Sequence, residues 1–498
     1  MIRRLFEQGS VYAIAAVVAK VGGLALLVVY VNEAILPKAD FGNLGVLDAT
    51  KSLGLLVAGV GLPIGMLRFA SSSGLSDRER AAVPATALLI ASLMALGVGT
   101  LGWVLAPTFA TWLPGVGPGP FRWLAVFIAF RTIADISMTE LRHREKTGTF
   151  VLASTLEVSL LVAGVLFFLV VRGEGLEGVL KGYAVSAVGL AIVLTPILLS
   201  HIDRRVLGSL VGPMLAFSAP LIASGLAGRF LNLGDRYLIV AFLGPELNAE
   251  YELAARFGGL VNTLVVQSFG MAFTVLGLKA LSAHAEPSFH RRSFRHFAAL
   301  AGFVTLALGL AFSDLVALLP TQDPAYARAD GLVVLTAGGF SLYGLYYITV
   351  NVLYAAGRTR AVAATVGLAA LVNLALNLLL IPSLGLAGAA LATLLAYGVL
   401  AYATGYAAEQ SLRVGYSWRS VLWVGAVVAG LWIAGQPADD WTLGARVALR
   451  AGLLLVYPAA LYGLGVYTRE DWRRGRHLVA ERRGSTAGAR RRRDGSER

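Results

Sequence analysis

The 498-residue sequence contains no cysteine, and only 14% of its residues are charged. The absence of cysteine excludes disulfide bonds, thiol catalysis and cysteine-ligated metal sites. Soluble domains carry about 25% charged residues, and no segment of this chain is polar over the length of a domain. The sequence also lacks a P-loop, a zinc-type spacing of histidines and a nucleophile elbow. We therefore expect neither an enzyme nor an ATP-driven pump, and we predict no catalytic residue, metal site or cofactor.

Apolar runs recur along the whole sequence, in which 57% of the residues are hydrophobic. Each run is long enough to cross a hydrocarbon core of about 30 Å at about 1.5 Å per helical residue. The pattern predicts an all-α integral membrane protein with about fourteen transmembrane helices. The predicted spans are residues 9–31, 43–67, 81–106, 121–141, 149–171, 179–200, 211–234, 252–276, 297–319, 332–354, 361–381, 385–408, 419–435 and 443–467.

The first run follows a basic start, Arg3 and Arg4, and so resembles a secretory signal. A signal has an apolar core of only about 7–15 residues. This run is longer, and Lys20 lies in its middle. We therefore expect an uncleaved first helix.

The lysines and arginines of the connections fall mostly on one side of the predicted membrane. Without the C-terminal tail, roughly 18 lie on that side and 6 on the other. The positive-inside rule places that side, and with it both termini, in the cytoplasm. Tryptophans near span ends, such as Trp103, Trp418 and Trp441, fit the headgroup zone. We expect a multi-pass protein of the cytoplasmic (inner) cell membrane.

The last residues, 469–498, form a basic segment that includes a run of four arginines at positions 490–493. The polar composition predicts a disordered cytoplasmic tail. Such a tail can determine topology, or it can adhere to anionic lipid headgroups at about 1 kcal/mol per basic residue. Nucleic-acid binding is the interpretation that we favour least, so we predict no nucleic-acid partner.

Several cationic side chains lie inside the predicted spans. A cation at the bilayer centre costs about 2.5–3.5 kcal/mol even on the lenient insertion scale, so it is retained where it pairs, lines a wet cavity or binds an anion. Arg446 and Arg450, near the outer end of the last span, fit lipid-headgroup anchoring. The full set is Lys20, Lys51, Arg131, Arg229, Arg256, Arg446 and Arg450.

Four of these cations are candidates for a shared binding site. If the first, second, seventh and eighth helices surround one cavity, these side chains form its cationic lining. Lysine grips phosphate by charge, and arginine adds bidentate hydrogen bonds. The predicted substrate-binding residues are Lys20, Lys51, Arg229 and Arg256.

Internal ion pairing is the alternative interpretation of these cations. Three acidic residues lie at helix-neighbour spacings from them. Lys20 has no acidic residue at such a spacing and Arg229 has none within four positions, which makes these two the strongest functional candidates. The possible pairs are Asp48 with Lys51, Arg131 with Asp135, and Glu252 with Arg256.

Carboxylates inside the spans favour a different function. Glu157 lies well inside the fifth predicted span, and Glu140 ends the fourth. A proton- or sodium-coupled transporter needs such groups within the membrane. These residues keep a cation-coupled mechanism open.

The chain resembles bacterial and archaeal polysaccharide flippases of the multidrug/oligosaccharidyl-lipid/polysaccharide exporter superfamily. The similar segments occur in the same order along nearly the whole chain. They include Gly9-Ser10-Val11-Tyr12, Leu36-Pro37-Lys38-Ala39-Asp40-Phe41-Gly42, Phe217-Ser218-Ala219-Pro220, Gly357-Arg358-Thr359-Arg360, Asn373-Leu374-Ala375-Leu376-Asn377 and Gly385-Leu386-Ala387-Gly388-Ala389-Ala390-Leu391-Ala392-Thr393.

The resemblance implies two pseudo-symmetric six-helix lobes, at residues 1–205 and 206–412, which rock against each other in alternating access. Two further helices within residues 413–468 and the basic tail would follow. In the lipid II and O-antigen flippases of this family, basic residues on helices 1, 2 and 8 contact a lipid-linked pyrophosphate. By position these correspond to Lys20, Lys51 and Arg256. Val21 stands where lipid II flippases carry an acidic residue.

The sequence thus predicts a flippase that moves an anionic polyprenyl-(pyro)phosphate-linked oligosaccharide across the membrane through a basic central cavity. Its partners would be this glycan lipid, membrane lipids and, as candidates, a glycan polymerase or glycosyltransferase. The first alternative is a MATE-type cation-coupled drug antiporter, which needs an acidic cavity. The second alternative is a membrane scaffold in glycan assembly.

Overall fold

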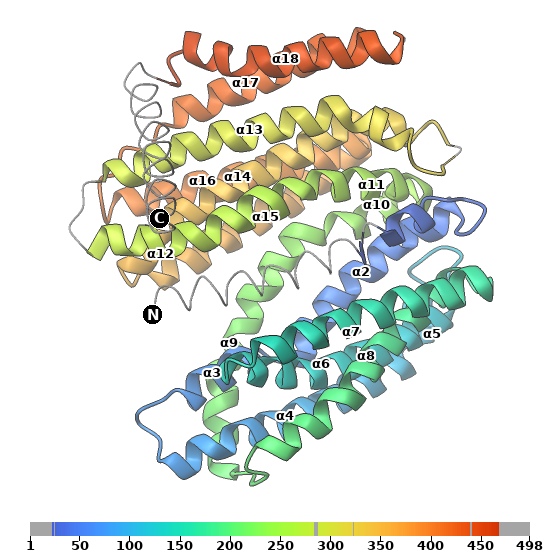
Figure 1. Cartoon of the computed structure of the whole chain (residues 1–498), viewed down its shortest axis with the longest axis vertical. Coiled ribbons are helices and arrows are strands. Elements are labelled where there is room, and N and C mark those ends of the chain that lie inside the picture. The colour runs from blue at the N-terminus through green and yellow to red at the C-terminus, as the bar shows by residue number, and fades with distance from the viewer. Residues whose placement is uncertain (1–21, 24, 283–286, 322, 439–440, 468–498) are drawn as a thin grey trace, which may run out of the picture. The chain divides into compact units, whose positions relative to one another are not determined.

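A computed structural model describes residues 22–23, 25–282, 287–321, 323–438 and 441–467 (Figure 1). All regular secondary structure in these residues is helical. Two segments are π-helical, η1 (Leu166–Val171) and η2 (Asn262–Gln267), and two are 3-10 helices, η3 (Ala327–Ala329) and η4 (Gln436–Ala438). The α-helices are α2 (Lys38–Gly59), α3 (Leu62–Ala70), α4 (Asp77–Val104), α5 (Ala106–Ala110), α6 (Pro118–His143), α7 (Thr147–Val165), α8 (Gly175–His201), α9 (Gly208–Leu233), α10 (Asp235–Leu243), α11 (Pro245–Val261), α12 (Ser268–Ser282), α13 (Ser288–Val316), α14 (Asp330–Ala355), α15 (Thr359–Leu384), α16 (Leu386–Glu409), α17 (Trp418–Gly435) and α18 (Leu443–Gly463).

Twelve helices among the described residues are long and apolar enough to cross a membrane. They match twelve of the predicted spans and make the chain a multi-pass membrane protein. Two predicted spans have no match among these twelve helices. The one at residues 121–141 corresponds to α6, which is 26 residues long but carries four charged residues, Arg122, Arg131, Asp135 and Glu140, along that span. The other, at residues 9–31, lies largely outside the described residues. The total of about fourteen transmembrane helices and the cytoplasmic location of both termini (the N-in/C-in orientation) stay predictions.

The chain forms two compact units. The first unit comprises Met1–Arg256, Ser313–Thr336 and Arg360–Leu400. Within it α6 packs against α4 and α8, α7 packs against α8, and α2 packs against α6 and α9. The predicted division into lobes at residues 1–205 and 206–412 stays a prediction, as do the boundaries of residues 413–468 and of the tail.

The second unit comprises Phe257–Phe312, Ala337–Thr359 and Ala401–Arg498. Helices α17 and α18 lie side by side in it (Figure 1). The Tyr457 hydroxyl of α18 donates a 2.8 Å hydrogen bond to the Ala299 carbonyl of α13. Arg450 of α18 is only 8% exposed, so its side chain packs within protein. The sequence instead predicts a side chain that extends into lipid headgroups.

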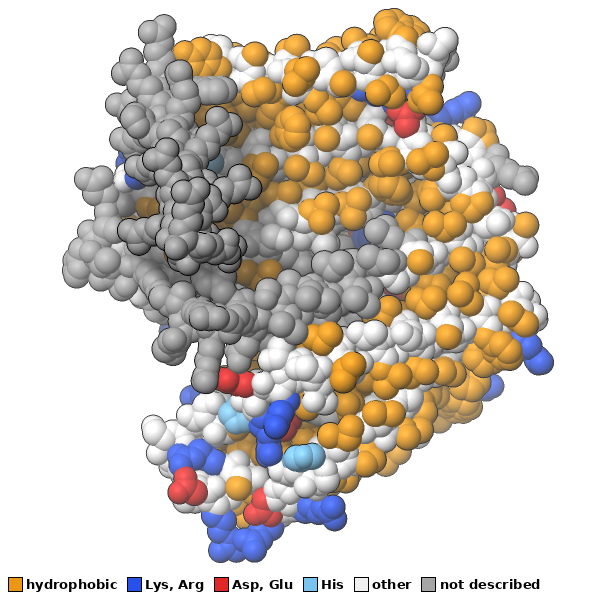
Figure 2. Space-filling view, in the orientation of Figure 1, with side chains coloured by type: hydrophobic (Ala, Val, Ile, Leu, Met, Phe, Trp, Pro, Cys, Tyr) orange, Lys and Arg blue, Asp and Glu red, His pale blue; other side chains and the backbone are white. Residues whose placement is uncertain are grey.

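Apolar and charged side chains separate clearly on the helices of the first unit. In Figure 2, hydrophobic side chains cover the visible sides of α4, α7 and α8, whereas lysines, arginines and acidic residues gather at one end of these helices. An apolar side with charged ends is the surface that a helix crossing a bilayer requires. The charge pattern read from the sequence is therefore present in three dimensions.

A short break separates α2 from α3. Val60 and Gly61 both adopt left-handed conformations, with φ of 47° and 64°. Pro63 then lies in the first turn of α3, where its missing N–H leaves no hydrogen bond unmade. Glycine fits this position because a left-handed residue with a Cβ is strained.

Helices α2 and α11 approach each other through their backbones. A Cβ on Gly42 would lie 1.7 Å from the Pro245 carbonyl oxygen. The Asn248 side chain also donates a 2.7 Å hydrogen bond to the Gly42 carbonyl. Close backbone contact through a small residue is a common way for membrane helices to associate. This contact positions the first turns of the two helices that carry the candidate site.

Replacing Gly42 with alanine is expected to destabilise the protein. Because the added methyl group meets backbone atoms that cannot rotate away, we expect a loss of at least about 1–3 kcal/mol, the usual range for overpacking. Thermal unfolding of the detergent-purified protein measures the effect. Gly59→Ala, in the same helix with nothing within 4 Å of the added Cβ, is the matched control. Equal unfolding temperatures for the two variants would contradict the expectation.

Candidate functional site

Two of the predicted substrate-binding residues meet at one carboxylate in the first unit. Lys51 Nζ lies 2.5 Å from Asp48 Oδ1, one turn away on α2. Arg256 Nη2, on α11, lies 3.2 Å from Asp48 Oδ2. The helical pairing of Asp48 with Lys51 is confirmed, and Asp48 also joins two helices that are far apart in sequence.

The ion pairs continue from Arg256 into the protein. Glu252 accepts from Arg256 Nε at 2.8 Å and from Arg236 Nε at 3.1 Å. Arg236 Nη1 in turn lies 2.8 Å from Asp235 Oδ1. Glu252 lies four residues before Arg256, so the second helical pairing is also confirmed. These contacts join six side chains of alternating positive and negative charge, which we call the six-residue network. Its members, in order of contact, are Lys51, Asp48, Arg256, Glu252, Arg236 and Asp235.

Burial divides the six-residue network into two halves. The side chains of Asp48, Lys51 and Arg256 are each about a quarter exposed, at 24%, 24% and 25%. Asp235 and Glu252 are buried, and Arg236 is 8% exposed. The first three can reach a ligand, whereas the last three are enclosed by protein. We call these the open half and the closed half of the network.

The charges of the network cancel. Three cations face three carboxylates, so these residues by themselves do not form the net basic lining that the sequence suggests. Any cationic surplus depends on the other two candidates, Lys20 and Arg229. Lys20 lies outside the described residues.

Packing places Arg229 between two contacts with α2, that of Gly225 with Leu56 and that of Tyr237 with Thr50. Helices α9 and α10 run antiparallel to α2, and Arg229 lies one turn beyond the level of Leu56. The side chain of Arg229 is exposed and forms no ion pair with the residues that the structure describes. The same two contacts set the register of these helices.

Aromatic rings face both cations of the open half. Lys51 Nζ lies 4.1 Å from the centroid of the Tyr183 ring of α8. The guanidinium of Arg256 lies 5.9 Å from the Tyr30 ring and 5.5 Å from the Phe41 ring. Cation–π contacts at such distances contribute about 0.5–2 kcal/mol each and hold a cation without neutralising it. These rings keep the cations in place while leaving their charge available.

A buried polar cluster supports the closed half. Asp235 accepts hydrogen bonds from the hydroxyls of Tyr251 and Thr393, the latter at 3.4 Å. Asn373 and Asn377 are each 1% exposed; Asn373 contacts Thr393, and Asn377 donates to Asn373. In the sequence these asparagines are only part of a segment that resembles the flippases, and nothing there places Asp235 next to them.

A second group of charges joins the start of α2 to distant parts of the first unit. Lys38 Nζ lies 2.7 Å from Glu250 Oε1 and 2.5 Å from Asp323 Oδ2. The hydrogen bond from Lys38 holds the pKa of Asp323 below its usual range. Because the pKa of Asp323 is lowered, the stabilisation that its ionised carboxylate provides is complete at neutral pH and is lost only in acid.

Arg131 of α6 is paired within protein. It lies 3.1 Å from Asp135 and 2.6 Å from Glu157 of α7. The pairing with Asp135 is confirmed. The pairing with Glu157 was missed, because it depends on how α6 and α7 pack. Two carboxylates share one arginine here, which leaves the cluster with a formal surplus of negative charge.

The fold of this chain is similar to that of solved membrane transporters. No protein-family model matches this chain, and neither does any curated protein sequence. Among solved structures, the lipid II flippase MurJ in an inward closed conformation is similar with a TM-score of 0.72. The sequences are 12% identical, and the similarity covers 92% of this chain and 99% of MurJ.

Two further transporters share the fold. An inward-facing multidrug-resistance MATE family transporter of the MOP superfamily has a TM-score of 0.65 and 14% identity, over 78% of this chain and 92% of its own. A MOP superfamily transporter from Pyrococcus furiosus, whose binding pocket has reversed polarity, has a TM-score of 0.56 and 14% identity, over 82% and 93%. The superfamily fold inferred from the sequence is confirmed.

Proposed function

We propose that this protein is a flippase for an anionic polyprenyl-(pyro)phosphate-linked oligosaccharide in the cytoplasmic membrane. The observation that carries the proposal is the open half of the network, where Lys51 and Arg256 converge on Asp48 from two helices of a flippase-type fold. Lys20 and Arg229 complete the proposed substrate-binding set. The oligosaccharide would serve export of a cell-surface polysaccharide or glycan.

The geometry supports binding by exchange of partners. In the structure Asp48 pairs with both Lys51 and Arg256 and supplies a single negative charge to the two cations. A pyrophosphate carries more charge and more acceptor oxygens than one carboxylate, and it matches the fork of an arginine. We infer that the substrate displaces Asp48 from these cations, while Glu252 keeps Arg256 oriented. Release would let Asp48 return, so the site does not hold its product.

The membrane potential supports the outward direction. Moving one elementary charge across 100 mV is worth about 2.3 kcal/mol. An anionic headgroup that leaves a negative interior therefore moves downhill if its charge is not cancelled during transfer. Alternating access by rocking of two lobes is the proposed route.

A cation-coupled drug antiporter is the second candidate function. The fold shared with MATE transporters supports it, and so does the cluster in which Arg131 faces both Asp135 and Glu157. An acidic site of this kind can exchange a proton or sodium ion for a cationic drug. It lies on α6 and α7, however, whereas the cations that converge on Asp48 favour an anionic substrate.

Mass spectrometry of lipids that co-purify with the full chain tests the proposal. We expect the wild type to retain a polyprenyl-phosphate glycan and Lys51→Ala to lose most of it, because the open half then keeps one cation for Asp48. Lys20→Ala is expected to act in the same direction. Lys181→Ala, which removes a lysine paired with Glu174 at 2.6 Å in another part of the first unit, is the control.

The same preparation decides between the two functions. A wild-type protein that retains no such lipid but binds organic cations would overturn the flippase proposal and support the antiporter. Equal retention by the wild type and Lys51→Ala would remove Lys51 from the substrate-binding set.

A further inference from the structure

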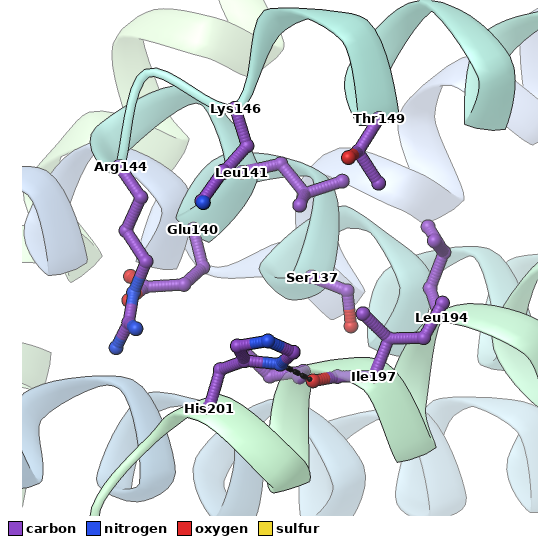
Figure 3. Close-up of a pocket in the computed structure, with 10 residues that line it drawn as sticks. Ser137, Glu140, Leu141, Arg144, Lys146, Thr149, Leu194, Ile197 and His201 are labelled. Carbon is purple, nitrogen blue, oxygen red and sulfur yellow. Dashed lines mark hydrogen bonds and ion pairs between the residues drawn. The ribbon is translucent and has the colours of Figure 1, made fainter.

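A separate cavity lies where α6, α7 and α8 meet at the charged end of the first unit (Figure 3). Its volume is about 130 Å³. A water in the liquid occupies about 30 Å³, so a group of several heavy atoms fits. Figure 3 shows Glu140, Lys146 and His201 around this space, from α6, the start of α7 and the end of α8. The lining comprises Ser137, Glu140, Leu141, Arg144, Lys146, Thr149, Leu194, Ile197, Leu198 and His201.

The floor of the cavity presents two acceptors without donors. Glu140 is 3% exposed and Ser137 is 2% exposed. Arg144 Nε occupies one oxygen of Glu140, Oε1, at 2.5 Å. Among the described residues, no donor reaches the other oxygen, Oε2, and the Ser137 hydroxyl also has no partner. A buried polar group left unsatisfied costs about 1–3 kcal/mol, and more when it is charged, so this floor suits a cationic donor.

The rim has the opposite polarity. Arg144, Lys146 and His201 surround the opening and are exposed. Lys146 precedes the first turn of α7 and forms no ion pair with the described residues. Two permanent cations beside a histidine favour an anion with several acceptor oxygens. The cavity therefore matches a ligand with an ammonium at one end and a phosphate at the other.

The walls indicate that this ligand is a lipid. Leu141, Leu194 and Leu198 line the cavity between its polar ends. Ile197, which also lines the cavity, is itself 37% exposed, and Val193, one turn earlier on α8, is 43% exposed. The cavity thus continues onto an apolar helix side of the kind that contacts acyl chains. A soluble zwitterion would gain nothing from this surface.

We propose that this cavity binds the headgroup of a zwitterionic phospholipid with a primary ammonium, the chemistry of phosphatidylethanolamine. The ammonium donates to Glu140 and Ser137, the phosphate lies between Arg144 and Lys146, and the acyl chains lie along α8. This site is distinct from the six-residue network and independent of the proposed substrate. The lipid would fasten α6, α7 and α8 together at one end.

Native mass spectrometry of the full-length, detergent-purified protein tests this assignment. The probes are dioleoyl phosphatidylethanolamine, phosphatidylcholine and phosphatidylglycerol. Phosphatidylcholine keeps the positive charge but lacks N–H donors, and phosphatidylglycerol lacks the cation. We expect phosphatidylethanolamine to bind about tenfold more tightly than either, a difference of about 1.4 kcal/mol. Equal binding of the three lipids would overturn the proposal.

Variants separate the two ends of the site. Glu140→Gln should abolish the preference for phosphatidylethanolamine over phosphatidylglycerol, whereas Lys146→Gln should weaken both lipids. Ser137→Ala removes an acceptor without breaking an ion pair, and it should lower the same preference. It therefore serves as the test if Glu140→Gln fails to fold. Arg78→Gln, which removes an exposed cation outside the cavity, should behave as the wild type.

One further probe distinguishes a lipid from a soluble ligand. Glycerophosphoethanolamine carries the same ammonium and phosphodiester charges without acyl chains. We expect it to displace bound phosphatidylethanolamine at least about 100-fold less well than the lipid itself, because each buried CH₂ contributes about 0.8 kcal/mol. Displacement at equal concentrations would overturn the assignment to a lipid. If the variants of Glu140, Ser137 and Lys146 all bind the lipids as the wild type does, the cavity is not the binding site.

Discussion

Replacing Arg256 with glutamine is expected to lower the affinity for a polyprenyl-pyrophosphate glycan by about 10- to 100-fold. A hydrogen bond to a charged group contributes about 1.5–3 kcal/mol, and the glutamine amide can keep one of the two that the arginine fork supplies, so the net loss is about one such bond. The protein should still fold, because Glu252 keeps its 3.1 Å contact with Arg236. The loss should therefore appear in binding rather than in stability.

Lysine at the same position separates charge from geometry. Arg256→Lys keeps the cation but loses the planar fork, so its affinity should lie between those of the wild type and the glutamine variant. Titration of a polyprenyl-pyrophosphate glycan into nanodiscs that hold each protein measures the series. Three equal affinities would show that Arg256 serves only to pair with Asp48 and Glu252.

Replacing Arg236 with methionine is expected to lower the stability of the protein strongly, in contrast to Arg256→Gln, which is expected to lower substrate binding. Arg236 is 8% exposed and pairs with Asp235 and Glu252. Removing one partner from a buried ion pair destabilises by about 3–5 kcal/mol, because the remaining charges stay buried. Thermal unfolding in detergent should show the loss directly.

An exposed arginine provides the control for this variant. Arg172 has a side chain that is 62% exposed and lies 3.4 Å from Glu174. Exposed pairs contribute about 0–1 kcal/mol, so Arg172→Met should unfold close to the wild-type temperature. If Arg236→Met does the same, the closed half of the network has no structural role. A second change, Asp235→Asn, should recover part of the loss by removing the buried carboxylate that pairs with Arg236, whereas Glu252 keeps its 2.8 Å contact with Arg256.

These two arginines differ although both contact Glu252. Arg256 belongs to the open half, where a ligand can take over the role of Asp48. Arg236 belongs to the closed half, where Asp235 and its buried neighbours leave no room for exchange. We infer that the closed half holds α10 and α11 in place so that the open half can change partners.

The sequence by itself determined the membrane class, most of the spans and the ion pairs within single helices. These features depend on local patterns: an apolar run must satisfy its backbone as a helix in lipid, and residues three or four apart share a helix face. The pairs of Lys51 with Asp48 and of Arg256 with Glu252 follow from that spacing. The resemblance of ordered segments to a known superfamily was also enough to anticipate the fold.

Only the tertiary structure decided which helices share their charges. Asp48 meets Arg256 across 208 residues, Lys38 meets Asp323 across 285, and Arg131 meets Glu157 of the next helix. The cavity beside Glu140 likewise needs three helix ends at one place. Such contacts depend on how helices pack through small residues such as Gly42, and no periodicity along one helix records its neighbours. The balance of charge at the candidate site was therefore decided by packing, although every residue in it could be read in advance.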